Sequence, residues 1–397
     1  MAGNEDWLNL KAFRAATPAA AVGVHLNAAS AGLQPRAVQQ AVAEQLDLEL
    51  LKGPHAAMAH AAVRIEPVRE AVAELLGRMP DEIAFGETSG RLWAMAFHAL
   101  RLSPGAKIIV SRGEWGSNVL NILRRRQLED IEVAVVERGR DGQLIVDHLR
   151  HLIDERTQAI CMPVVESATG FRQPVEAVGA LPRPDSCLFF VDGAQAVGRF
   201  PVDAMALNAD ILVAPARKWL RGPRGQALMA LSPRALEILG DPPIIDQLAG
   251  TTFGWDGYAL RDVSRRFEAY EFSWAARLGL GAAIRHVQSW GIAAIAAAID
   301  ARVAQICQGL QAIPGVQVWE AQADRPAFLT FALANHEASS VTARLAQSDI
   351  TIATLDWRTT RLNFEPPRTC NRVAPHAYTT EADIARFLDA IHSLASL

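Results

Sequence analysis

The sequence predicts an α/β protein with a doubly wound, mostly parallel β-sheet and a second, smaller domain. Short apolar runs alternate with helical patterns through the middle of the chain. Most of these runs are continuously apolar, which is typical of strands covered on both faces. After about Gly257 the pattern changes to two long helices and a few short strands. The alternation of strands and helices favours a parallel sheet between helical layers.

Seven segments are predicted to be strands. In chain order they are Ile83–Phe85, Lys107–Ser111, Ile131–Val136, Ala159–Val165, Cys187–Asp192, Asp210–Ala214 and Gln226–Leu231. Helical patterns lie between them, over Arg91–Leu102, Gly116–Gln127 and Val146–Asp154. Ligands of such sheets bind beyond the carboxyl ends of the strands, where the candidate residues below are found.

Residues 31–256 are expected to form the larger domain. Residues 257–397 are expected to form the smaller one, with residues 1–30 packing against it. The smaller domain should contain two long helices, two candidate strands and a closing helix capped by Thr379 or Thr380. These elements are Arg265–Trp290, Ile292–Ile313, Ala327–Leu333, Arg372–Ala374 and Glu381–Leu394.

The composition argues against several classes of function. The 397 residues carry a net charge of −4 with mixed signs, which makes nucleic-acid binding a poor hypothesis. No run approaches the roughly twenty apolar residues that cross a bilayer, and the first residues do not resemble a signal peptide. The four cysteines lie far apart without metal-site spacing, as expected for thiols in a reducing compartment. We therefore expect a cytoplasmic protein that binds no metal, membrane or nucleic acid.

An acid and an amine stand at the ends of two apolar runs. Asp192 ends the run CLFFVD, and Lys218 follows ILVAPA beside Arg217. Taken alone, Asp192 fits a helix N-cap and Lys218 fits a surface lysine at a strand end. Taken together, they can hold the two ends of a flat, charged cofactor. Pyridoxal phosphate is such a cofactor, because its aldehyde needs a lysine and its ring nitrogen needs an anion.

The same segment resembles a known family. VDGAQAVG, the following Asp210 and ARKWLRGPRG are similar to the core of the class V aminotransferases, which are fold-type I pyridoxal-phosphate enzymes. That family includes cysteine desulfurases, isopenicillin-epimerase-like proteins and carbon–sulfur lyases of ergothioneine-type pathways. The resemblance runs from Leu26 to Phe387. It implies a seven-stranded large domain, a smaller α+β C-terminal domain, and a homodimer with the active site at its interface.

The resemblance also implies roles for residues around the cofactor ring. Lys218 would form the Schiff base and later move the substrate's α-proton. Asp192 would pair with the ring nitrogen, and Gln195 would face the phenolic oxygen. Trp115 stands where the family places a ring-stacking aromatic or histidine, although core packing is its alternative. Ser167 matches a position often found near the phenolic oxygen.

The phosphate would be held by the start of a helix and by two further contacts. Free N–H groups and the helix dipole favour an anion there. The residues at this helix start are Thr88, Ser89 and Gly90, which also fit an ordinary helix cap. Arg217 replaces the histidine of cysteine desulfurases and would donate to the phosphate. Either Thr251 or Thr252 would reach the phosphate of a partner subunit.

Arg372 matches the family arginine that grips the substrate's α-carboxylate, a task that suits a bidentate guanidinium. A surface arginine at a strand start is the alternative. Asn27 would add a donor from the N-terminal segment. These two residues are the predicted substrate contacts.

The cofactor permits several reactions, and the groups around Cα decide among them. Persulfide chemistry of the cysteine desulfurase type is disfavoured, because Cys370 lies too near Arg372 to act as a mobile thiol. We expect β-elimination that cleaves the C–S bond of a cysteine S-conjugate, of the kind found in secondary metabolism. An aminotransferase, an epimerase or a decarboxylating deaminase is the alternative.

Two hypotheses from other classes fit less well. A dinucleotide-binding dehydrogenase would need Gly-x-Gly-x-x-Gly after an early strand, and residues 86–90 do not have that spacing. A scaffold without catalysis would not need a buried amine opposite a buried acid.

Overall fold

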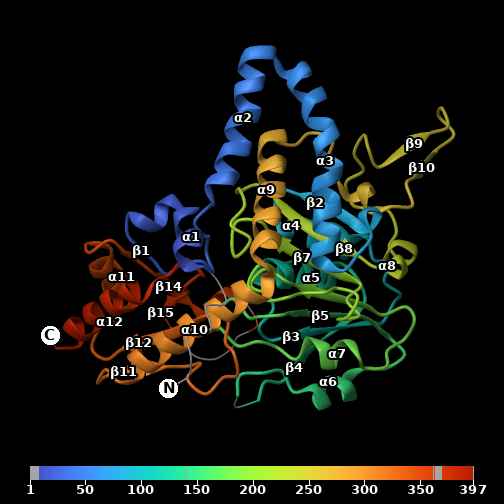
Figure 1. Ribbon diagram of the computed structural model, residues 1–397. Helices are drawn as coiled ribbons and strands as arrows, with labels where there is room; N and C mark the ends of the chain where they lie inside the picture. Colours follow the sequence, from blue (N-terminus) through green and yellow to red (C-terminus); the bar gives the residue numbers. More distant parts are fainter. Residues whose placement is uncertain (1–8, 140, 361, 363–368, 397) are drawn as a thin grey trace.

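The computed structural model describes residues 9–139, 141–360, 362 and 369–396. Figure 1 shows a large α/β part around a central sheet, beside a smaller part that contains the C-terminus. The predicted fold class is confirmed. The boundary expected near residue 257 stays a prediction.

A seven-stranded sheet forms the centre of the larger part. Its strands are β2 (Ile83–Gly86), β3 (Ala106–Ser111), β4 (Ile131–Val136), β5 (Thr157–Pro163), β6 (Leu188–Asp192), β7 (Ile211–Pro215) and β8 (Ala227–Leu231). They lie in the order β2-β8-β7-β6-β5-β3-β4. All neighbours from β7 to β4 are parallel, whereas β8 is antiparallel to β7 and β2. Each strand lies within two residues of its predicted bounds, because buried strands read as continuous apolar runs.

Helices cover the sheet and connect its strands. The connecting helices are α4 (Ser89–Ala99), α5 (Gly116–Leu128), α6 (Val146–Leu152) and α7 (Val175–Gly179), and α8 (Pro233–Ile238) follows the last strand, β8. A tall helical hairpin of α2 (Arg36–Lys52) and α3 (Pro54–Leu76) rises beside α9 (Trp274–Trp290), which packs against both (Figure 1). A thin hairpin of β9 (Gly250–Thr252) and β10 (Tyr258–Leu260) projects from the body.

The predicted helix Arg265–Trp290 was wrong at its start. Residues Ser264–Phe267 form a 3-10 turn (η3), and α9 begins only at Trp274. The Ser273 side chain caps α9 by accepting from the amide of Ala276. Glu268 lies between the turn and the helix, where it accepts from Arg69 at 2.8 Å and from the amide of Phe85 at 2.9 Å. These tertiary bonds hold the segment in a non-helical path.

The smaller part contains an antiparallel sheet in the order β11-β12-β15-β14. Its elements are α10 (Ile292–Gln311), β11 (Val316–Val318), β12 (Leu329–Leu333), α11 (Ala338–Ala346), β13 (Ile350–Thr351), β14 (Ala353–Asp356), η4 (Trp357–Thr360), β15 (Thr369–Val373) and α12 (Glu381–Ala395). Thr380 caps α12, and its hydroxyl accepts from the amide of Asp383. Of the two caps expected, Thr380 is therefore the one that the helix uses.

The N-terminal segment crosses onto the smaller part. It contains α1 (Leu10–Ala15), η1 (Pro18–Ala21) and β1 (Val24–His25), while η2 (Pro80–Glu82) precedes β2. β1 pairs in parallel with β13, and Arg14 forms an ion pair of 2.6 Å with Asp383. The segment then leads into α2 on the larger part.

Helix α10 has the length and composition of a membrane span. A core helix of a globular fold meets the same criterion. One face of α10, with the side chains of Ile295, Ile299, Val303 and Ile306, is buried against the rest of the protein. On the same helix, Asp300 pairs with Arg199 of the larger part.

Candidate active site

A cavity of about 620 Å³ opens beyond the carboxyl ends of β6 and β7. Most of the predicted site residues line it: Thr88, Ser89, Gly90, Trp115, Ser167, Asp192, Gln195, Arg217, Lys218 and Arg372. Asn27 and Thr252 are not among the lining residues. Asn27 is partly buried and contacts Arg372, which does line the cavity, and Thr252 is exposed on the projecting hairpin. The strand ends therefore bring together ten residues that lie far apart in the chain.

Asp192 and Lys218 meet in this cavity because β6 and β7 are neighbours in register. Asp192 is the last residue of β6 and is aligned with Val213 of β7, five residues before Lys218. The pKa of Lys218 is lowered to about 7, mainly by burial and to a smaller degree by the charges of Arg217 and Arg372, while the charge of Asp192 opposes the shift. Burial raises the pKa of the Asp192 carboxyl, and the charge of Lys218 counteracts this rise. An amine with such a pKa is unprotonated and nucleophilic in a substantial fraction of molecules at neutral pH.

The start of α4 forms one end of the cavity. Thr88 is the N-cap, and its hydroxyl accepts from the amide of Arg91 at 3.1 Å. Ser89 and Gly90 are the first two residues of the helix, where backbone N–H groups lack helical partners. A Cβ at Gly90 would lie 2.8 Å from the hydroxyl oxygen of Ser117, so glycine permits the close approach. This end suits the phosphate of a cofactor.

Three arginines line the cavity: Arg217, Arg224 and Arg372. In the described part of the chain none of them forms an ion pair with an acid. Arg217 donates to the carbonyl oxygen of Ser30, and the nearby charge of Arg224 helps burial to lower its pKa. A phosphate brings nearly two negative charges and an α-carboxylate one, which together balance three guanidinium groups. Sequence reasoning missed Arg224, although it stands in the same GPRG turn that follows Lys218.

Arg372 comes from β15 of the smaller part and is oriented by the N-terminal segment. Its Nη2 donates to Asn27 Oδ1 at 3.3 Å and to the hydroxyl of Ser30. Its guanidinium lies over the ring of Phe328 at 5.3 Å. Its buried Nε has no hydrogen-bond partner, so a donor remains for a ligand. Asn27 accepts a hydrogen bond from Arg372, and its expected contact with substrate stays a prediction.

Gln195 is held on both sides of its amide. Its Nε2 donates to the carbonyl oxygen of Ala29 at 3.1 Å, and its Oε1 accepts from Trp219 Nε1 at 2.9 Å. Both side chains are buried. Sequence reasoning missed Trp219, since a tryptophan after the lysine gives no sign of which residue it bonds.

Ser167 and Trp115 also line the cavity. The Ser167 hydroxyl is buried without a partner, which leaves it able to bond a ligand. Trp115 is 40 % exposed at the start of α5. Its partly open ring suits a role in facing the cofactor better than the alternative of core packing.

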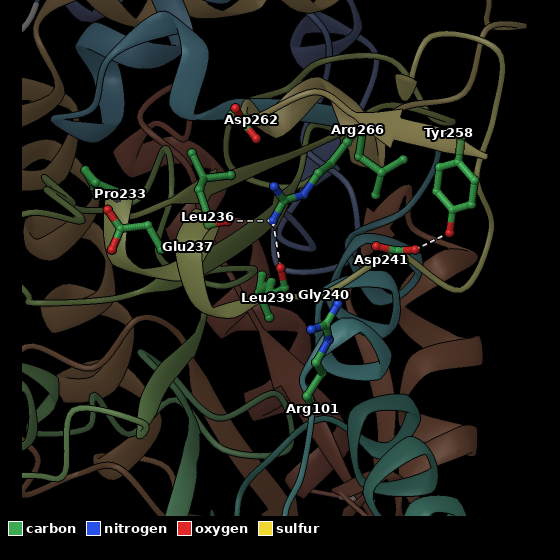
Figure 2. A pocket seen from close by; sticks show the side chains of 11 residues that line it. Arg101, Pro233, Leu236, Glu237, Leu239, Gly240, Asp241, Tyr258, Asp262 and Arg266 are labelled. Atoms are coloured by element: carbon green, nitrogen blue, oxygen red, sulfur yellow. Dashed lines mark hydrogen bonds between the residues drawn. The ribbon is translucent and has the colours of Figure 1, made fainter. Parts of the chain in front are cut away.

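A second cavity, of about 720 Å³, lies at the base of the β9–β10 hairpin (Figure 2). It contains none of the predicted site residues and no lysine. Three of its polar side chains bond to other parts of the fold. Arg266 Nη2 donates to the carbonyl oxygens of Leu236 and Leu239, and the Tyr258 hydroxyl bonds Asp241.

The described residues contain no cluster of three His, Cys, Asp or Glu side chains able to hold a metal ion. The four cysteines, all described, do not line the first cavity. Cys161, Cys187 and Cys370 are buried and Cys307 is partly exposed.

Comparison with known proteins agrees with this geometry. The fold and the cavity are those of a fold-type I pyridoxal-phosphate enzyme. The family model described as Aminotransferase class-V matches residues 24–387, and the chain belongs to that family.

The chain is 28 % identical to a probable cysteine desulfurase of Methanothermobacter thermautotrophicus, over 68 % of each chain. It is 27 % identical to a cysteine desulfurase of Klebsiella pneumoniae, over 94 % of each. Among solved structures, the apo cysteine desulfurase of Thermococcus onnurineus has a TM-score of 0.87 at 22 % identity, with complete coverage of both chains. The cystine C-S lyase C-DES with its product cysteine persulfide has a TM-score of 0.83 at 19 % identity, covering 95 % of this chain and 99 % of that one.

Proposed function

We propose that the protein cleaves the Cβ–S bond of a cysteine S-conjugate by β-elimination. The observation that carries the proposal is the convergence of Lys218, Asp192 and Arg372 on a cavity that no cysteine lines. The first two residues suit the cofactor, and Arg372 suits an amino-acid carboxylate. The relatives named above support carbon–sulfur chemistry, because they are called cysteine desulfurases and a cystine C-S lyase.

Each residue has a task in this reaction. When bound, pyridoxal phosphate withdraws electrons from the substrate's α-carbon. Lys218 would carry the cofactor covalently, with Asp192 ionised beside the ring nitrogen and the start of α4 against the phosphate. Arg372 would orient the substrate through its carboxylate, which places the Cα–H bond near Lys218. Lys218 would be released as a free amine when the substrate's amino group takes its place on the cofactor, and it would then take the α-proton. The electrons of the Cα–H bond would form a Cα–Cβ double bond, and those of the Cβ–S bond would leave with the sulfur, which then takes up a proton.

The sulfur product would leave as a free thiol rather than pass to a cysteine of this chain. Cys370 is fully buried in a small cluster with Ala168 and Trp357. The sequence from 361 to 368, just before it, contains no cysteine. A direct transfer of sulfur to the protein therefore lacks an accessible thiol at the cavity.

Free cysteine is the second candidate substrate, because the relatives are named for its desulfuration. This candidate requires an acceptor for the sulfur from outside the chain. We further propose a cytoplasmic homodimer in which Thr252 of one subunit approaches the cofactor phosphate of the other. We also propose that this reaction is part of secondary metabolism.

The test is product analysis on the holoenzyme. Cysteine, cystine and a panel of S-alkyl and S-aryl cysteines would be incubated with the protein, and pyruvate and thiol would be measured. We expect both products from an S-conjugate in equal amounts, and neither from the K218A variant. Conversion to the pyridoxamine form without thiol release would overturn the proposal in favour of amino transfer. Sulfide or persulfide from cysteine alone would favour the second candidate.

A further inference from the structure

Glu114 is a buried acid that the proposed reaction does not use. It lies between β3 and α5, and its side chain is completely buried. No basic side chain among the described residues forms an ion pair with it. Burial and the neighbouring charge of Asp192 raise the pKa of Glu114 to about 8. The acid therefore holds a proton at neutral pH, because an unpaired buried charge is costly.

The contacts of Glu114 all lead to groups that face the cofactor cavity. Its Oε1 accepts from the amide of Trp115 at 2.8 Å and from Asn118 Nδ2 at 2.9 Å. Asn118 Nδ2 also donates to Asp192 Oδ2 at 3.4 Å. The second oxygen of Asp192 accepts from the amide of Ala194 at 2.8 Å. A chain of hydrogen bonds thus runs from Glu114 through Asn118 to the acid at the end of β6.

The side-chain amide of Asn118 determines which groups donate and which accept in this series of hydrogen bonds. A carboxylate only accepts hydrogen bonds, so Asn118 must turn its nitrogen toward Asp192. The amide nitrogen has two hydrogens, and Glu114 Oε1 receives the one that does not face Asp192. Without Glu114, this orientation would depend on Asp192 and on the Ser117 hydroxyl, which donates to Asn118 Oδ1 at 3.4 Å. Glu114 therefore strengthens the orientation in which the Asn118 nitrogen faces Asp192.

Other buried carboxylates in the protein lack this connection. Glu166 bonds Arg138 and Thr169, and Glu320 bonds the amide of Gly170 and Thr330. Their partners hold the fold together and none is Asp192 or Lys218. Glu114 differs because its bonds end at the residue that would meet the ring nitrogen and at the backbone of Trp115.

We infer that Glu114 is a positioning residue that acts through Asn118 to orient Asp192 toward the cofactor's ring nitrogen. By accepting the hydrogen bond from the backbone amide of Trp115, Glu114 also helps to place that residue. This inference rests on the proposed function, since it assumes that Asp192 faces a bound pyridine ring. Glu114 acts as a neutral acceptor, so its shape and oxygen matter and its charge does not.

Three variants test the role by cofactor affinity, measured by titrating the apo protein with pyridoxal phosphate. E114Q keeps an acceptor oxygen and should bind within about threefold of wild type. E114L removes the acceptor and should bind about tenfold more weakly, the effect of one hydrogen bond to a charged network. N118A should weaken binding equally, and the double variant E114L/N118A should lose no more than either single one.

The pH titration of the bound cofactor's absorbance gives a second readout that a structural role would not change. The midpoint pH of this titration should shift in E114L and N118A and should be unchanged in E114Q. E320Q, at a buried acid away from the cavity, is the matched control and should leave affinity and titration unchanged. Thermal unfolding of the apo proteins shows whether E114L folds, and N118A serves alone if it does not.

The outcomes separate the inference from the proposed function. Wild-type affinity in E114L and N118A, or losses that add in the double variant, would overturn the inference. A tenfold loss in E114Q as well would also overturn it, since the charge would then be essential. Failure of the wild-type holoenzyme to release thiol would refute the proposed reaction while leaving the affinity results as a valid test of Glu114.

Discussion

The indole nitrogen of Trp219 donates a hydrogen bond of 2.9 Å to the side-chain oxygen of Gln195. An indole N–H can only donate, so this bond fixes which end of the Gln195 amide is the oxygen, while the NH₂ group donates to the carbonyl oxygen of Ala29 and has a second hydrogen left. The residue directly after Lys218 thus sets the orientation of a second cavity residue. The free hydrogen of Gln195 would suit its predicted role of facing the cofactor's phenolic oxygen.

The W219F variant should lose this control. Phenylalanine keeps most of the ring volume but has no donor, so the amide of Gln195 could rotate. We expect the affinity for pyridoxal phosphate to fall about five- to tenfold, in line with one buried hydrogen bond. Measurement by equilibrium titration, with W290F at a half-buried tryptophan outside the cavity as control, tests the bond. Equal affinities in W219F and wild type would contradict it.

Cofactor uptake by the apo protein should depend on pH through Lys218. Its pKa is lowered to about 7, mainly by burial, so the amine is neutral and nucleophilic above that value. As pH falls through 7 the amine is protonated, and the rate of covalent incorporation should fall with it. Stopped-flow absorbance between pH 5.5 and 9.5 measures this rate. A rate that continues to rise steeply above pH 9 would indicate an ordinary lysine.

Replacing Arg372 should affect substrate binding more than the cofactor. R372A removes the guanidinium that Asn27 and Ser30 orient, and a charged hydrogen-bonded pair contributes roughly 1.5–3 kcal/mol. We expect KM for the amino acid to rise by one to two orders of magnitude, with little change in cofactor absorbance. R386A, at an exposed arginine of α12, is the control. An unchanged KM in R372A would place the substrate carboxylate elsewhere.

Thr252 can be tested by mixing subunits. If it serves the partner's site, a heterodimer of K218A and T252A has one intact site, made of one wild-type lysine and one wild-type threonine. A 1:1 mixture at limiting cofactor should recover about a quarter of the wild-type activity, because half the dimers are mixed. K218A mixed with D192N should stay inactive, since both defects lie within their own sites. Equal inactivity in both mixtures would contradict a shared site.

The sheet could be predicted closely because its strands are buried on both faces and read as unbroken apolar runs. Asp192 and Lys218 could be predicted because strand ends of a parallel sheet meet at one edge. Glu114 and Asn118 were missed although their four-residue spacing places them on one turn. That spacing does not reveal that the turn faces Asp192. The late start of α9 also depends on a distant contact, between Glu268 and Arg69.

The pairing of β1 with β13 has a consequence for biogenesis. The residues of β1 find their strand partner only after more than three hundred further residues have been made. Next to this pair of strands, the amide of Ala28 donates to the carbonyl oxygen of Ala374, and the amide of Ala374 donates to the carbonyl oxygen of Leu26. The Arg372 end of the first cavity is therefore completed only after β15 has been made, although the central sheet can assemble earlier on the ribosome.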